Sequence, residues 1–251
     1  MIAQLQKHVR LWFLTAIALL AAVPPAIARD FTYEYAGQTL TYTVLSEEDK
    51  TCEVKQYSNN TSGDVFMGTV VIPVTVSDGA NNYTVTTIGE SAFYRHSDSQ
   101  LILTSIELPS SVTTIAPFAF AYRSELKSIK LPSSLTMIGA YAFIGCSELT
   151  SIELPGTVTS IGDGVFKSCS NLTTIDLPSS VTTIGYEAFS CCTGLTSIEI
   201  PTSVTTISEN VFSWSGLTSI ELHSSVTAIG AGAFAWCYNL ASIDLPSSIT
   251  T

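Results

Sequence analysis

The chain is poor in charge, and in positive charge above all. Only 12 % of its 251 residues are Asp, Glu, Lys or Arg, which is about half the share of an average soluble protein. Ten Lys and Arg stand against 21 Asp and Glu, so the formal net charge is −11. Nucleic-acid binding and polybasic membrane binding both require a basic face. The composition therefore argues against both kinds of partner.

Long apolar runs are scarce as well, and the one present lies at the N-terminus. A charged start precedes the apolar run 11–23, Pro24 and Pro25 end it, and Ala26-Ile27-Ala28 supplies small residues at alternate positions. This pattern predicts a secretory signal peptide over residues 1–28, because the run is too short to span a bilayer. We therefore expect a secreted or cell-surface protein with a mature net charge of −13, no membrane insertion after cleavage, and an oligomeric state that the sequence leaves open.

What the chain does contain is a repeat of about 23 residues. Its unit is L-x-x-I-x-[LI]-P-x-x-[VL]-T-x-I-G-x-x-[AV]-F-x-x-C. The proline column, in which one histidine takes a place, is Pro109, Pro132, Pro155, Pro178, Pro201, His223 and Pro246. The phenylalanine column, 11 residues further on, is Phe120, Phe143, Phe166, Phe189, Phe212 and Phe234. So many columns in register predict a repeat architecture.

Each unit has a simple physical interpretation. Alternation around Ile198 and Glu199 predicts a strand with isoleucine inward and glutamate outward. Pro201 ends this strand, because proline lacks the backbone donor that the ladder needs. A second short extended piece follows, and then a short helical turn that places a phenylalanine such as Phe189 inside. Since one unit cannot bury these side chains alone, we expect a solenoid with one layer for each repeat.

The LTSIELP, SSVTTIG and AFxxC-type blocks, as in Leu149 to Cys169, resemble the BspA-like leucine-rich repeats of bacterial and protist surface proteins. The resemblance covers roughly residues 67–251. It implies a right-handed solenoid with parallel β-strands on one face and short strand or helical turns on the other. It also implies an extracellular adhesin or interaction surface that binds host matrix proteins or other cells. The chain departs from common leucine-rich repeats because hydroxyl residues stand where an Asn ladder would run, namely Ser111, Ser134, Thr157, Ser180, Ser203, Ser225 and Ser248.

The two ends differ from the repeats. Alternation over 31–44 around Ala36-Gly37-Gln38 predicts a β-hairpin, and 52–57 a further strand. We therefore expect a small β-rich N-terminal cap over 29–66 and a solenoid of about eight repeats over 67–251, with an insertion at 77–82. The last repeat stops at its middle, which favours a fragment or a truncated reading frame.

The cysteines permit two interpretations. One column lies three residues after each phenylalanine and contains Cys146, Cys169, Cys192 and Cys237. Stacked thiols could bind a metal or form disulfides, but no C-x-x-C pair occurs. A column of small buried side chains is the interpretation we favour. Cys191 is expected to face away from this column, and Cys52 to be a free thiol in the cap.

Catalytic groups are not evident. The G-x-G-x-x-A match at Gly230 coincides with repeat columns, so it does not indicate a dinucleotide site. His223 takes the place of a repeat proline, and His96 lies in an insertion. We therefore expect no enzyme, no catalytic residues, no cofactor and no metal site.

The outward strand face is the best candidate for ligand binding. Its charged column is Glu107, Lys130, Glu153, Asp176, Glu199, Glu221 and Asp244, and the neighbouring hydroxyl column includes Ser151, Thr174 and Ser197. Such a stripe suits a basic segment of an extracellular protein and, less well, Ca²⁺. Alternatively, the acids only keep a weakly charged solenoid soluble. A glycan-binding module is the other functional alternative, with Trp214 and Trp236 as stacking platforms.

Overall fold

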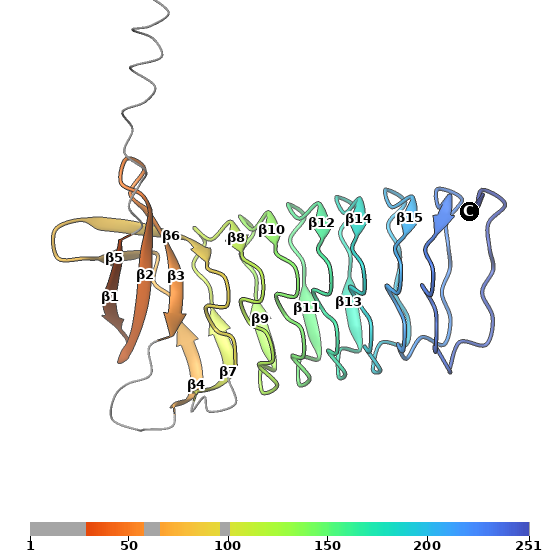
Figure 1. Ribbon diagram of the computed structural model, residues 1–251, viewed down its shortest axis with the longest axis horizontal. Coiled ribbons are helices and arrows are strands. Elements are labelled where there is room, and N and C mark those ends of the chain that lie inside the picture. The colour runs from red at the N-terminus through yellow and green to blue at the C-terminus, as the bar shows by residue number, and fades with distance from the viewer. Residues whose placement is uncertain (1–28, 58–65, 96–100, 251) are drawn as a thin grey trace, which may run out of the picture.

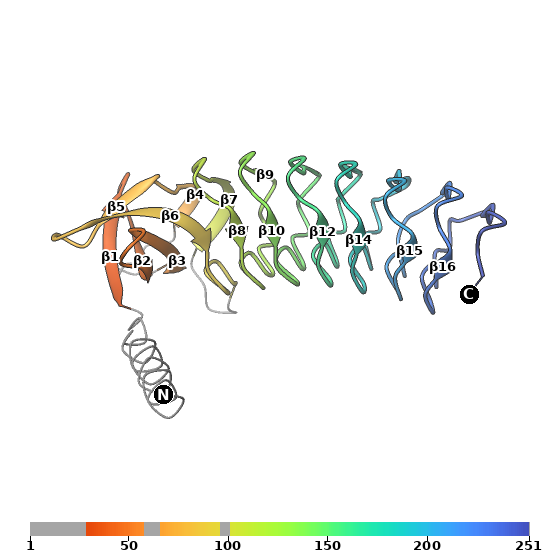
Figure 2. The same ribbon diagram turned by 90° about the horizontal axis from the view of Figure 1, so that it is seen from above.

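The computed structural model describes residues 29–57, 66–95 and 101–250. The signal-peptide prediction and His96 lie outside these ranges. Within them every regular element is a strand, and the coils stack along the long axis of the molecule, away from a β-rich N-terminal end (Figure 1). The view from above in Figure 2 shows the same order of coils, which agrees with the predicted solenoid.

The N-terminal end begins with the predicted hairpin. Strand β1 (Asp30–Tyr35) pairs antiparallel with β2 (Gln38–Ser46). Ala36 and Gly37 join them with φ values of 53° and 74°. Positive φ at both central residues is what a tight two-residue hairpin requires. Strand β3 (Thr51–Tyr57) then pairs antiparallel with β2.

One sheet runs from this cap into the coils. Strand β3 is parallel to β6 (Asn82–Ile88), which pairs with β8 (Thr114–Ile115), which pairs with β10 (Met137–Ile138). The sheet order is therefore β1-β2-β3-β6-β8-β10. The predicted insertion forms a second hairpin, because β5 (Thr75–Ser77) pairs antiparallel with β6. The boundaries of cap and solenoid stay a prediction, since the sheet itself is continuous across them.

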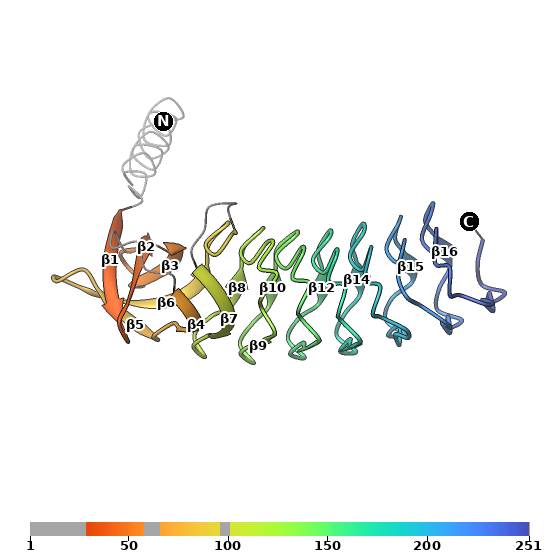
Figure 3. The ribbon, with the colours of Figure 1, turned by 90° about the horizontal axis from the view of Figure 1, so that it is seen from below.

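The predicted outward-facing strands form two further sheets. Strands β4 (Phe66–Val71), β7 (Leu101–Glu107) and β9 (Ser128–Lys130) pair in parallel. Strands β11 (Ser151–Glu153) and β13 (Thr174–Asp176) pair in the same way in the next coils. Figure 3 shows β4, β7 and β9 beside one another near the start of the stack.

Short strands follow β10 in the later coils as two separate two-stranded sheets. Strand β12 (Ser160–Ile161) pairs in parallel with β14 (Thr183–Ile184), and β15 (Thr206–Ile207) with β16 (Ala228–Ile229). In each pair the isoleucine at the end of one strand faces the equivalent isoleucine one coil away. The outward strand expected around Ile198 and Glu199 is a correction: no regular strand forms there, and in the later coils this side keeps only an isolated bridge between Glu221 and Asp244.

The core is a stack of the repeat columns. Neighbouring phenylalanine rings lie nearly parallel, with centroids 5.2–5.8 Å apart. The column consists of Phe93, Phe120, Phe143, Phe166, Phe189, Phe212 and Phe234. Five consecutive rings from Phe120 to Phe212 are fully buried. The inward assignment of this column is confirmed.

The turn that carries each phenylalanine is not helical, and this corrects the expected short helical turn. The residues two before and two after Phe189 are Glu187 and Cys191, with φ values of 53° and 61°. The other coils repeat this pattern. Left-handed residues on both sides prevent a right-handed helix from continuing. A hydrogen-bonded turn therefore takes its place.

The hydroxyl column links adjacent coils by hydrogen bonds at the place where an Asn ladder would run. Each of its side chains donates to the carbonyl of a valine or leucine in the preceding coil, at 2.5–3.5 Å, from Ser111 to Val85, Ser134 to Val112, Thr157 to Leu135, Ser180 to Val158, Ser203 to Val181, Ser225 to Val204 and Ser248 to Val226. These bonds satisfy carbonyls that would otherwise be unpaired where the coil bends.

Candidate functional site

The predicted ligand-binding residues lie together on the exposed side of one face. Glu107 faces Lys130 and Glu153 faces Asp176 in the parallel register, and Glu221 forms a bridge with Asp244. All seven charged residues are exposed, as are Ser151, Thr174 and Ser197. The isoleucines between the two columns are buried in the first six of these coils. We call the seven charged residues the acidic strand stripe.

The acidic strand stripe has no side-chain partners among the residues that the structure describes. Neither Lys130 nor any of its six carboxylates takes part in an ion pair or a side-chain hydrogen bond there. Neighbouring strands lie about 4.8 Å apart, and like charges at such a distance repel by roughly 1 kcal/mol in water. The stripe is thus a row of unneutralised carboxylates that a cationic partner would relieve.

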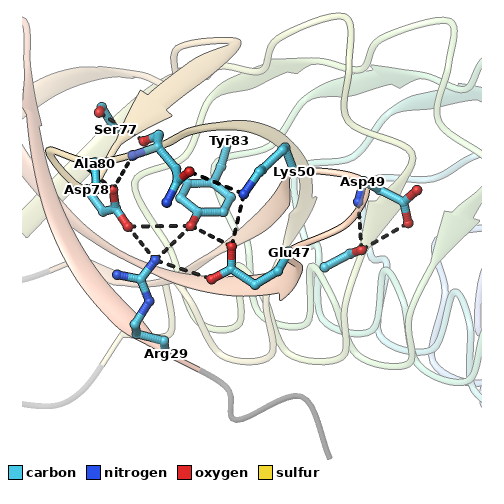
Figure 4. A network of polar contacts seen from close by, with 10 residues as sticks. Arg29, Glu47, Asp49, Lys50, Ser77, Asp78, Ala80 and Tyr83 are labelled. Atoms are coloured by element: carbon cyan, nitrogen blue, oxygen red, sulfur yellow. Dashed lines mark hydrogen bonds and ion pairs between the residues drawn. The ribbon is translucent and has the colours of Figure 1, made fainter. Parts of the chain in front are cut away.

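The ion pairs of the described residues lie elsewhere, and four of the six involve a residue of the cap. Figure 4 shows Arg29 between Asp78 and Glu47, with the guanidinium Nη2 donating to the Tyr83 hydroxyl at 2.7 Å. Tyr83 in turn donates to Glu47 Oε2 at 2.9 Å. This network joins the start of β1, the end of β2 and the β5–β6 hairpin. It therefore ties the cap to the β5–β6 hairpin.

Asp78 is the most perturbed carboxylate of this network. Its side chain is 2 % exposed, and its Oδ1 accepts hydrogen bonds from the backbone N–H groups of Asn81 and Ala80 at 2.7 and 2.8 Å. These two bonds, together with Arg29, hold the pKa of Asp78 far below its ordinary value. The carboxylate therefore stays charged over the physiological pH range.

The cysteine column is a buried hydrogen-bonded column. Each thiol donates to the carbonyl of the phenylalanine in the preceding coil at 3.0–3.3 Å, from Cys146 to Phe120, Cys169 to Phe143, Cys192 to Phe166 and Cys237 to Phe212. All six cysteines are free thiols, and Cys191 is the one that is not buried. Burial raises the pKa of Cys146 to about 12 and those of Cys169 and Cys192 well above the ordinary value. The interpretation as small buried side chains is confirmed, and the carbonyl acceptors are an addition that the sequence did not predict.

Other candidates for chemistry are not gathered into a site. No group of three or more His, Cys, Asp or Glu is placed to hold a metal ion in the described ranges. Cys52 is buried in the cap, and burial raises the pKa of its thiol to about 12. His223 is half-buried at its proline position. Among the described residues, no helix is long and apolar enough to cross a membrane.

One surface feature was only partly predicted. Trp214 and Trp236, named as stacking platforms, form a cluster with Tyr238, whose ring lies 5.8 Å from that of Trp214. The two tryptophans share a column two residues after each phenylalanine. Tyr238 lies outside that column, so the spacing did not point to it.

The repeats match a known family model. The model for the BspA type leucine rich repeat region matches residues 86–216 and 159–251, more than half of the chain. The chain belongs to the BspA-type leucine-rich repeat family. No match was found among curated proteins.

Several solved structures of bacterial leucine-rich repeat proteins are similar to this chain. The T. pallidum leucine-rich repeat protein is 28 % identical over 83 % of this chain and 90 % of its own, with a TM-score of 0.66. A protein from Eubacterium ventriosum is 24 % identical over 84 % of this chain and 50 % of its own, with a TM-score of 0.64. A leucine-rich cell surface protein from Faecalibacterium prausnitzii is 26 % identical over 90 % of this chain and 79 % of its own, with a TM-score of 0.49. The first two likenesses support the leucine-rich repeat fold.

Proposed function

We propose that this protein is a secreted or cell-surface scaffold that binds an extracellular protein through the acidic strand stripe. In this role it is an adhesin that engages host matrix or cell-surface proteins. The signal-peptide pattern supports export, and membership of the BspA-type family supports a protein-interaction surface. We assign it no enzymatic activity, because no catalytic motif accompanies His96 or His223, and His223 takes the place of a repeat proline.

One observation carries the proposal: the carboxylates of the stripe are exposed and unpaired over consecutive coils. No Lys or Arg follows Lys167 in the sequence, so the field of the later coils is uniformly negative. A partner that presents a row of cations gains attraction from several coils at once. We therefore expect a basic segment of the partner to lie along the stripe.

The test is binding of residues 29–251 to immobilised extracellular-matrix proteins at low and at high salt. A variant with Glu153, Asp176, Glu199 and Glu221 changed to Ser is measured beside the wild type. We expect binding that weakens in salt and is lost in the variant. A thermal melt shows whether the variant is still folded.

A matched control removes the same charge from elsewhere. Glu34, Glu48, Glu148 and Glu209 are exposed and lie off the stripe, and changing all four to Ser alters the net charge equally. This control should bind like the wild type. Equal loss in both variants would assign the effect to net charge, and absence of binding by the wild type would contradict the adhesin role.

A further inference from the structure

The aromatic cluster lies on the outer side of the turns that carry the phenylalanines, which we call the turn face. The rings of Trp214 and Trp236 are stacked, with centroids 5.3 Å apart and planes 24° apart. Tyr238 packs edge-on against Trp214, at 74° between the planes. Trp214, Trp236 and Tyr238 are 47 %, 58 % and 74 % exposed. Three large aromatic side chains thus lie in water outside the core.

The fold does not require aromatic residues at these positions. The same column contains Gly145, Ser168 and Cys191 in other coils, and each of these has a positive φ. Trp214 and Trp236 adopt φ values of 60° and 62°, a region that is unfavourable for bulky side chains. Neither burial nor backbone preference accounts for the two tryptophans, and residues held in such a conformation point to a functional role such as ligand binding.

Trp214 has one face covered and one face open. Trp236 covers the face toward the next coil. The preceding coils present Cys191 and then Ser168 in this column, and the Cys191 N–H donates to the Ser213 carbonyl at 2.8 Å, which holds the adjacent coils in register. Because these side chains are short, they leave room above the indole. A ligand ring could take the place that an aromatic residue at position 191 would occupy.

Charged groups of the turn face bear on the chemistry of the ligand. Lys167 and Glu187, in the two preceding coils, form an ion pair whose side chains are 28 % and 17 % exposed. Lys167 also interacts electrostatically with Cys191, which precedes Trp214 in the column. The pair is neutral as a whole and offers both donors and acceptors. A cationic ligand would meet Lys167 and an anionic ligand would meet Glu187, whereas a neutral polyhydroxyl ligand opposes neither. An apolar ring face beside a few polar groups is also the usual composition of a small-molecule site.

We propose that the turn face around Trp214 binds a neutral glycan. The apolar face of a pyranose ring stacks on the open face of the indole, and its hydroxyl groups exchange hydrogen bonds with Lys167 and Glu187. Trp236 and Tyr238 hold the Trp214 ring in place. This site lies on a different face from the acidic strand stripe and takes a different class of ligand, so it goes beyond the proposed function.

The mature chain carries its own reporter for this site. Trp12 belongs to the predicted signal peptide, so Trp214 and Trp236 are the two tryptophans of residues 29–251. Their fluorescence is measured while the protein is titrated with neutral oligosaccharides of glucose, mannose, galactose and N-acetylglucosamine. At least one series should give a saturable change. Trp214→Ser should weaken that binding about fivefold, which corresponds to a stacking contribution of about 1 kcal/mol.

Two variants make the test specific. Trp214→Ser introduces the residue that Ser168 provides in the same column, and Trp236 remains as the reporter. Tyr122→Ser changes another exposed aromatic residue of this column, with φ of 61°, and should leave sugar binding unchanged. Thermal melts of both variants show that the fold is retained.

Several results would overturn the glycan site. They are the absence of a fluorescence change with every sugar, equal affinity in Trp214→Ser, and a response to an arginine-rich peptide in place of sugars. A dimer that Trp214→Ser dissociates would assign the cluster to self-association. The stripe variant used to test protein binding should bind sugars like the wild type, so failure of one proposal leaves the other standing.

Discussion

The cap and the coils are stabilised in different ways. Three of the six ion pairs found in the described residues lie within the cap, and a fourth joins Arg29 of the cap to Asp78 beyond it. The coils rely on columns of identical contacts, such as the phenylalanine stack and the hydroxyl bonds to preceding carbonyls. A coil inside a stack has its polar groups satisfied by its neighbours. The first coil has no preceding coil, so its polar groups must be satisfied by side chains that do not belong to the repeat columns.

Gln38 shows this difference most clearly. Its Nε2 donates to the Thr69 carbonyl at 2.8 Å, and its Oε1 accepts from the Val71 N–H at 3.4 Å. The side chain is therefore a substitute for the missing neighbour of β4. Gln38 is 6 % exposed, so its side chain makes these two hydrogen bonds largely away from water.

The largest effect is expected in the coils. Phe189 is fully buried, with Phe166 and Phe212 at 5.6 and 5.7 Å on its two sides. Phe189→Ala should lower the free energy of unfolding by about 3–5 kcal/mol through the cavity that it leaves, as measured by urea denaturation. Tyr186→Ala, in the same coil but 38 % exposed, is the control and should change it by under about 0.5 kcal/mol. A similarly small change in the free energy of unfolding of both variants would mean that the phenylalanine stack does not stabilise the core.

A smaller effect is expected where cap and coils meet. Gln38→Ala should lower the free energy of unfolding by about 0.5–1.5 kcal/mol, because it removes the part-buried hydrogen bonds that Gln38 makes with the Thr69 carbonyl and the Val71 N–H. Hydrogen exchange at Val71 should accelerate while exchange at Ile152 in the coils stays slow. Glu34→Ala, on the exposed side of β1, is the control. Unchanged exchange at Val71 would show that Gln38 does not cover this edge.

Acid should weaken the cap selectively. Hydrogen bonds and cationic partners hold the pKa values of Asp78, Glu47 and Asp30 below their ordinary values of 3.8, 4.5 and 3.8. Their contribution to stability is therefore complete above those values and is lost as the pH falls below about 4 toward the folded-state pKa values. The melting temperature of the wild type should fall over this range.

The same acid titration in Asp78→Asn isolates the cap. Its melting temperature should be lower near neutral pH, and should fall less steeply in acid. Asp176→Asn, in the unpaired stripe, is the control and should follow the wild-type curve. If Asp78→Asn also followed that curve, the acid dependence would have to originate outside this network.

The smallest effect concerns the reactivity of the cysteine thiols and involves no change in stability. The thiols of the cysteine column are buried, and burial raises the pKa of Cys146 to about 12, so their thiolate fraction at neutral pH is negligible. Reaction of the native protein with a thiol reagent at neutral pH should modify Cys191 alone, and Cys191→Ser should abolish it. All six thiols should react after unfolding. Rapid modification of more than one thiol in the native protein would show that the coils open locally.

Much of the fold was predictable because the sequence repeats. Residues separated by one repeat occupy equivalent places in adjacent coils, so the columns of Phe189 and Ser180 predicted neighbours in space without further information. The Ala36-Gly37 hairpin was predictable for a local reason, since both residues tolerate positive φ in a tight turn. The acidic strand stripe followed from strand alternation alone.

Only the tertiary structure decided the contacts that have no period. Gln38 reaches Thr69 across 31 residues and Arg29 reaches Tyr83 across 54, and nothing in either segment marks the other as its partner. The turn at Phe189 was expected to be helical, but its backbone conformation depends on bonds to the next coil, such as that from the Phe189 N–H to the Val211 carbonyl. The sequence by itself determined the columns, because a shift by one coil places each residue over its equivalent in the next coil. The cap, the turns and the face of Trp214 depend on how different segments meet, which only the folded chain decides.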